Sequence, residues 1–201
     1  MNMKRIVMIV AALAVLATGC SKGQKFTLKG DLASAGFSAR TDSLILQSDA
    51  FPQLITIPVQ DGTFSYSGQV DAPVAASLKA IGGEMSTMMV VLEKGVITFQ
   101  DGAPAGTALN DASSELLRSL KAIIKENSGN RSKIQEEAGE EIREYLSDHG
   151  KDASAVLAIL LGRRLVEPAV LSELIASTAP AVQNDSHVHR ISKQLKSMRK
   201  E

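Results

Sequence analysis

Five glutamates form the densest group of side chains that could perform acid–base chemistry. They are Glu136, Glu137, Glu140, Glu141 and Glu144. Two carboxyl groups act as general acid and base when burial drives their pKa values apart. At helical spacing these glutamates lie opposite the apolar Ile134, Ala138 and Ile142, and Arg143 and Lys133 temper their repulsion. We therefore expect a solvated helix face.

The three histidines are the first candidates for metal ligation. His187 and His189 are two positions apart, and His149 stands alone. On a helix, positions two apart point about 200° away from each other, so the pair cannot easily share one metal ion. We expect no acidic residue to complete a metal site with this pair. We expect no metal site and no cofactor here.

Three methionines lie close together and could supply soft thioether ligands. They are Met85, Met88 and Met89. Because Met88 and Met89 are adjacent, they point to opposite faces of a strand. Core packing is the favoured interpretation.

Motifs of common enzymes are not found in the sequence. It has no G-x-S-x-G nucleophile elbow and no Walker or dinucleotide-binding glycine spacing. The segment Asp42-Ser43-Leu44 matches an acceptor pattern for bacterial O-glycosylation. Ser43 is thus a candidate glycosylation site, on a pattern short enough to arise by chance.

Cys20 is the only cysteine and carries the most specific signal. Lys4 and Arg5 precede an uncharged apolar run at residues 6–16, which is too short for a membrane-spanning helix. Residues 1–19 are therefore predicted to be a secretory signal peptide. Residues 16–20, LATGC, resemble a bacterial lipobox, although the commonest pattern places the leucine one position closer to the cysteine. The lipobox implies cleavage before Cys20 and a diacylglyceryl group on its sulfur.

The alternative is a short N-terminal anchor helix with an incidental cysteine, which leaves the position of Cys20 to chance. A single cysteine excludes an intramolecular disulfide, a C-x-x-C redox pair and a multi-cysteine zinc site. Residues 20–25 form a polar tether without the acidic cluster of many surface-exported lipoproteins. We expect a lipid anchor on Cys20 in the cell envelope, most simply in the outer membrane facing the periplasm.

Composition separates the 201-residue chain into two halves. Residues 20–109 carry 14 charged residues and 10 glycines, whereas residues 110–201 carry 28 and 4. Strands followed by helices, an α+β fold, match this change. Without residues 1–19 the chain has 20 basic and 22 acidic residues, and aromatics make up 3% of the whole. Neither value favours nucleic-acid binding.

The first half is predicted to be an antiparallel β-sandwich or partly open barrel at residues 26–107. Alternating apolar residues indicate strands at 26–32, 43–47, 55–59, 64–66, 74–80, 88–92 and 96–99. Asp61-Gly62 predicts a type I′ hairpin, because that turn needs positive φ at both central residues. Residues 93–95 predict a second hairpin with a longer loop.

The second half is predicted to be a helical region at residues 110–201. Its first helix is expected after Asn110 or Asp111 as a cap, and Gly150 is expected to end the second as its C′ residue. Asp152 is the expected cap of the third. Pro168 fits the first turn of a fourth helix that ends near residue 180. A fifth, from residue 185 or 186, is expected to bury residues 188, 191, 195 and 198.

The order of several short motifs resembles a known module. These motifs are Phe26-Thr-Leu-Lys-Gly30, Asp61-Gly62-Thr63-Phe64, Gly68, Pro73, Leu92-Glu93-Lys94-Gly95 and Gly106-Thr-Ala-Leu-Asn110. They resemble the N-terminal β-rich module of unknown function in lipid-anchored thiol:disulfide interchange proteins, and residues 110–201 resemble the helical connector before their thioredoxin domain. This chain has no C-x-x-C motif. The resemblance therefore implies an accessory module without redox chemistry of its own.

Two functions are expected for such a non-catalytic envelope lipoprotein. The first is an interaction module that acts with another envelope protein, such as a separate thioredoxin-like protein. The second is a periplasmic binding module for a small ligand or peptide. A solid core with an exposed apolar strip on one helix would favour the first. A large apolar cavity, or a groove between sheet and helices, would favour the second.

Overall fold

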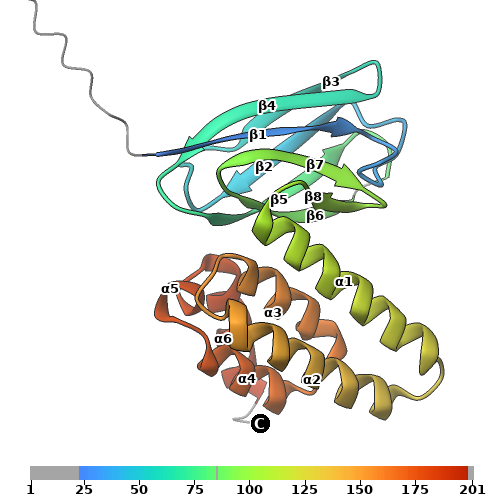
Figure 1. Cartoon of the computed structure of the whole chain (residues 1–201), viewed down its shortest axis with the longest axis vertical. Helices are drawn as coiled ribbons and strands as arrows, with labels where there is room; N and C mark the ends of the chain where they lie inside the picture. The colour runs from blue at the N-terminus through green and yellow to red at the C-terminus, as the bar shows by residue number, and fades with distance from the viewer. Residues whose placement is uncertain (1–22, 85, 199–201) are drawn as a thin grey trace, which may run out of the picture.

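The computed structural model describes residues 23–84 and 86–198, in which a β region is followed by a helical region (Figure 1). Cys20 and Met85, two residues singled out by sequence, lie outside the described residues. The strands are β1 (Gln24–Asp31), β2 (Ser43–Ser48), β3 (Ile55–Gln60), β4 (Thr63–Val70), β5 (Val74–Ile81), β6 (Thr87–Leu92), β7 (Gly95–Gln100) and β8 (Ala103–Ala105). All seven predicted strands are present, and β8 is an addition.

The strands form one mixed sheet in the order β6-β5-β2-β3-β4-β1-β7-β8, which curls into a nearly closed barrel (Figure 1). The predicted α+β fold with an N-terminal barrel is confirmed. The expectation of a purely antiparallel sheet is wrong, because β1 pairs in parallel with β7. β1 also pairs antiparallel with β4, so it is held on both sides.

Two Asp-Gly turns shape the barrel. Asp61 and Gly62 have φ of 51° and 73°, which confirms the predicted hairpin between β3 and β4. Asp101 and Gly102 have φ of 52° and 74°, and they join β7 to β8 in a hairpin that was not predicted.

The predicted hairpin between β6 and β7 is wrong. Among the described strands, β6 pairs only with β5, while β7 pairs with β1 and β8. The two strands follow each other in sequence but belong to opposite ends of the sheet order. The barrel brings β6 near β8, and we call the boundary between these two strands the seam.

Six helices follow in the described part of the chain. They are α1 (Ala108–Glu126), α2 (Arg131–His149), α3 (Ser154–Leu165), α4 (Pro168–Ser177), α5 (Pro180–Gln183) and α6 (Ser186–Met198). Pro168 occupies the first turn of α4, as predicted. Residue 180 is the first residue of the extra short helix α5.

Four details of the helix ends differ from prediction. Thr107, and not Asn110 or Asp111, precedes α1, and Ala153, and not Asp152, precedes α3. Gly150 is the C-cap of α2, with φ of −62°, and not the C′ residue that follows the cap. Met198 is 61% exposed, because the last turn of α6 extends past its packing partners Val188, Ile191 and Leu195.

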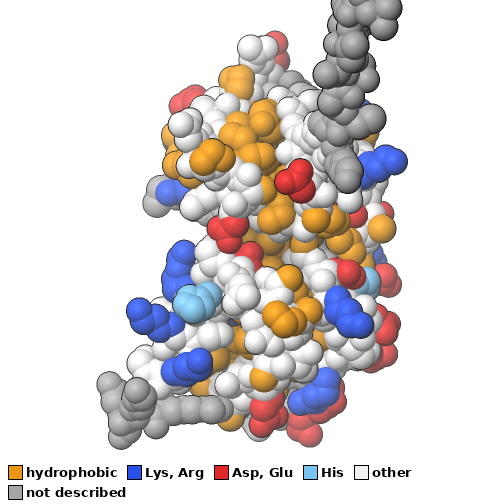
Figure 2. Space-filling model, turned by 90° about the vertical axis from the view of Figure 1, so that its left-hand side faces the viewer, with side chains coloured by type: hydrophobic (Ala, Val, Ile, Leu, Met, Phe, Trp, Pro, Cys, Tyr) orange, Lys and Arg blue, Asp and Glu red, His pale blue; other side chains and the backbone are white. Residues whose placement is uncertain are grey.

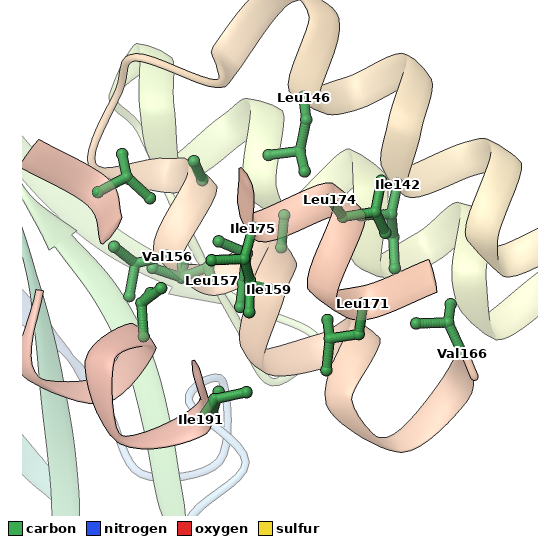
Figure 3. Close-up of a cluster of buried hydrophobic side chains, with 14 of the residues drawn as sticks. Ile142, Leu146, Val156, Leu157, Ile159, Val166, Leu171, Leu174, Ile175 and Ile191 are labelled. Atoms are coloured by element: carbon green, nitrogen blue, oxygen red, sulfur yellow. The ribbon is translucent and has the colours of Figure 1, made fainter. Parts of the chain in front are cut away.

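Two hydrophobic cores share the wall made by β5 and β6. Ala76 and Val90 face the barrel core, whereas Ala75 and Val91 face the helical core. Figure 3 shows the helical core, where side chains of α2, α3, α4 and α6 point toward one another. Because these strands are apolar on both faces, they show a run of buried residues in place of alternation.

The two halves of the molecule differ in surface charge, as they do in composition. Figure 2 shows charged side chains of both signs spread over the helical half and fewer of them on the barrel half. The exposed large hydrophobic residues are scattered, and each lies in a different strand, helix or loop: Leu54, Ile81, Val96, Ile124 and Met198. No exposed apolar strip runs along one helix of the described residues.

Candidate functional site

The glutamate cluster lies on α2, where Glu136, Glu140 and Glu144 are exposed. Arg143 Nη1 lies 2.6 Å from Glu140 Oε1, and Lys133 Nζ lies 3.4 Å from Glu137 Oε1. These are surface ion pairs on one helix. Glu136 and Glu140 line an open groove of about 310 Å³ together with Arg143 and Glu167, and both glutamates are exposed to solvent.

The histidines lie at separate places. His149 stacks on Tyr145 with ring centroids 4.6 Å apart, and its Nδ1 lies 3.0 Å from Asp152 Oδ2. His187 is half-buried, and its Nδ1 lies 3.4 Å from Asp185 Oδ1, whereas His189 is exposed. Among residues 23–84 and 86–198, no three His, Cys, Asp or Glu side chains gather in a group that could hold a metal ion.

The remaining candidates lie on strands. Ser43 begins β2, is half-buried, and is paired with Pro58 on one side and Ile81 on the other. Met88 packs against the barrel core and Met89 against the helical core, so the two side chains point to opposite faces as predicted.

The seam is closed at one end by Asn110 of α1. Its side chain is fully buried, and its Oδ1 accepts a hydrogen bond from Val91 N at 2.9 Å. Its Nδ2 donates to Val91 O at 2.8 Å and to Thr107 Oγ1 at 2.8 Å. The amide therefore satisfies both outward-pointing backbone groups of Val91, as a neighbouring strand would.

Glu93 fixes the start of α1 beside this contact. Its buried carboxylate oxygen Oε1 accepts from Leu109 N at 2.8 Å and from Asn110 N at 3.3 Å. The first N–H groups of a helix have no partner within the helix, and a carboxylate there is favourable. Glu93 thus ties the end of β6 to α1.

The edge of β8 is blocked by Pro104. The two-residue turn makes Gln100 and Ala103 a hydrogen-bonded pair, so Pro104 faces away from β7 toward the seam. Proline has no N–H, and the carbonyl of Pro104 accepts a hydrogen bond from Ser114 Oγ. β8 therefore offers no free backbone group to β6.

The edge of β6 is open at its other end. Ala80 N donates to Ser86 O, which makes this a hydrogen-bonded pair and sets the alternation along β5 and β6. The backbone N–H and C=O groups of Thr87 and Met89 then point away from β5. Unlike Val91, they have no hydrogen-bond partner within the described residues.

A groove of about 700 Å³ lies at this open end, between the barrel and helices α1 and α3. Its apolar wall includes Phe37, Met88, Leu117, Leu157, Leu160 and Leu161. Thr87, Met89 and Pro104 also line it, so the open part of the seam faces the groove. The size and apolar lining match a ligand site.

Two arginines border the groove. Arg163 and Arg164, in the last turn of α3, are exposed and line it. Neither forms an ion pair within the described part of the chain. Within the described residues, the groove therefore combines an apolar wall with two cations that have no anionic partner.

The sequence did not reveal this site. In the sequence, Leu157, Leu160 and Leu161 form an ordinary apolar helix face, and Arg163 and Arg164 belong to no motif. The signal available was the adjacent arginine pair that follows an apolar run. Its position beside β6 depends on tertiary packing.

No protein family, curated protein or solved structure matches the chain. No helix among the described residues is long and apolar enough to span a membrane.

Proposed function

We propose that the protein is a non-catalytic, lipid-anchored envelope protein that binds an apolar group of a ligand or partner in the groove between barrel and helices. The groove carries this proposal, because it is the feature that distinguishes a binding module from a solid interaction module. The barrel interior is filled by Leu28, Leu44 and Leu78, each fully buried, so the barrel leaves the ligand site outside its own core.

The proposed anchor would hold the N-terminal end of β1 close to a membrane. Cys20 is four residues before Gln24, the first residue of β1. Four extended residues span at most about 14 Å. In the outer membrane facing the periplasm, a protein tethered this closely meets lipids and other envelope proteins. The resemblance to thiol:disulfide interchange proteins makes a separate thioredoxin-like protein a candidate partner.

Photo-crosslinking in the producing cell tests the binding function. Benzoylphenylalanine is incorporated at Leu161, which lines the groove, and in a control at Leu54, which is exposed and does not. We expect irradiation to give a covalent adduct at residue 161 and none at residue 54. Intact mass then separates a small ligand from a protein. Equal yields at both positions, or none at either, would contradict a binding function of the groove.

A further inference from the structure

We propose that the groove receives an extended segment of a partner protein, which adds to β6 as a further strand. This inference rests on the proposed function and names the class of ligand. The occupant is a peptide in β conformation with apolar side chains and an acidic residue near one end.

The backbone of β6 supports a strand as the occupant. Thr87 and Met89 present N–H and C=O groups to the seam, and an extended peptide satisfies such groups with its own alternate residues. Val91 is the next residue of β6 whose N–H and C=O point toward the seam, and the side-chain amide of Asn110 bonds both groups. An acyl chain would fill the apolar volume but would leave these backbone groups without partners.

The two walls of the groove match the alternation of a strand. A strand added to β6 would continue its two faces. On the outer face lie Leu157 and Leu161 of α3, and toward the barrel lie Phe37 and Met88. Both sets of alternate side chains would therefore meet apolar surface, which limits the bound segment to apolar or small residues at this point.

The charge of the rim points to an acidic residue in the segment. Arg163 and Arg164 lie at the groove without an anionic partner in the described residues. An arginine binds a carboxylate through two parallel hydrogen bonds. The same pair would repel a basic segment, so it contributes to the choice of partner.

Pro104 on β8 leaves the edge of β6 unpaired at the groove. Since Pro104 has no N–H and its carbonyl is bonded to Ser114, the barrel cannot close here by pairing β8 with β6. An incoming strand would therefore pair with β6 alone.

The test uses the full acylated chain in lipid nanodiscs and a defined peptide. The probe is a fluorescein-labelled octapeptide of alternating alanine and valine that ends in two aspartates. Fluorescence anisotropy, with empty nanodiscs as the blank, measures binding. We expect saturable binding that weakens with salt and with Arg164→Glu, since the rim charge is then reversed.

Backbone pairing is tested by removing single N–H groups. Thr87→Pro deletes one edge donor at the first position of a strand, where proline is tolerated, and Thr87→Val keeps the donor. We expect Thr87→Pro to weaken binding about tenfold and Thr87→Val to leave it nearly unchanged. N-methylation of alternate peptide residues should abolish binding in one register and spare it in the other. Circular dichroism checks that both variants remain folded.

Four results would overturn the strand proposal. Equal affinity of the two N-methylated peptides would show that the peptide backbone does not hydrogen-bond to β6. Covalent capture of a photoactivatable palmitate by groove residues, with no peptide bound, would retain the binding function and assign the groove to lipid. Crosslinking from Leu161 to a second copy of the chain would assign the β6 edge to self-association. If neither peptide nor palmitate binds, the proposed function fails as well.

Discussion

The two strands that border the seam, β6 and β8, differ in whether their outward-facing backbone groups are hydrogen-bonded. On β8, the only residue facing outward is Pro104, whose nitrogen has no hydrogen and whose carbonyl is bonded to Ser114. On β6, Val91 is fully bonded to Asn110, whereas Thr87 and Met89 are left without partners in the described residues. An edge that is blocked and an edge that is half open therefore face each other.

The difference indicates that exposure of the β6 edge is local. Unpaired strand edges invite pairing with other chains, and proteins block them with proline, charge or a covering element. Here Pro104 blocks the edge of β8, and the buried side-chain amide of Asn110 blocks the edge of β6 at Val91. The unblocked half is the part that opens into the groove. The comparison suggests four tests.

The largest effect is expected from removing the amide that closes the seam. Asn110→Leu should lower the free energy of unfolding by about 4 kcal/mol, because the buried N–H and C=O of Val91 each lose a partner at about 1–3 kcal/mol. Urea denaturation of the full chain measures it. Asn184→Ala, at an exposed asparagine, should change stability by less than about 0.5 kcal/mol. Similar losses for both variants would rule out a special role for Asn110.

Hydrogen exchange should distinguish the closed and open parts of β6. We expect the Val91 amide to exchange about a hundredfold more slowly than the Met89 amide, because only Val91 N is bonded to a buried group. Residue-resolved NMR of the unliganded protein measures both rates. Val90, whose amide faces β5, serves as the protected reference. Equal protection of residues 89 and 91 would refute the open edge.

A smaller effect is expected at Glu93. Glu93→Ala should cost about 2 kcal/mol, since two N–H groups at the start of α1 lose their acceptor. Glu93→Gln keeps one acceptor oxygen and should cost less. Urea midpoints of the two variants provide the measurement, and a larger loss for the glutamine variant would contradict this role of the carboxylate.

The smallest effect concerns the loop at the open end of the seam. Ser34 donates from its backbone N and from its Oγ to Asp31, which lowers the pKa of that carboxyl below its ordinary value. Ser34 O in turn accepts from Gly102 N. A lowered folded pKa stabilises the protein at neutral pH, and this contribution is lost as the pH falls from the ordinary aspartate range through the folded value.

Asp31→Asn should therefore be slightly less stable than the native chain at neutral pH, and the difference should vanish in acid. Urea midpoints across that pH range check it, with Asp71→Asn at an exposed carboxylate as the control. A difference that persists in acid would assign the effect to packing.

Local patterns predicted the elements, and non-local contacts decided their arrangement. Alternation located seven strands, and Asp61-Gly62 located a hairpin. The same signal at Asp101-Gly102 predicts the β7–β8 hairpin and could have been used. The pairing of β1 with β7 could not be predicted, because nothing local marks residues 26 and 95 as partners.

The candidate site shows the same limit. Asn110 is a residue type that commonly caps helices. Its hydrogen bonds to Val91 form only because α1 packs on β6. The groove needs Leu117 of α1, Leu161 of α3 and Met88 of β6 at one place. Each is an ordinary apolar residue in its own segment, so no pattern along the chain distinguishes it. Lipidation of Cys20 and glycosylation of Ser43 stay predictions from sequence.

The pairing of β1 on both of its sides has a consequence for the order of folding. This first strand pairs with β4 and with β7, so one of its ladders joins residue 26 to residue 95. Contacts this distant in sequence must overcome the entropy of closing a long loop, and they slow folding. The first strand to be synthesised is thus among the last to be fully paired. We expect the barrel to remain incomplete until nearly all of its chain has emerged.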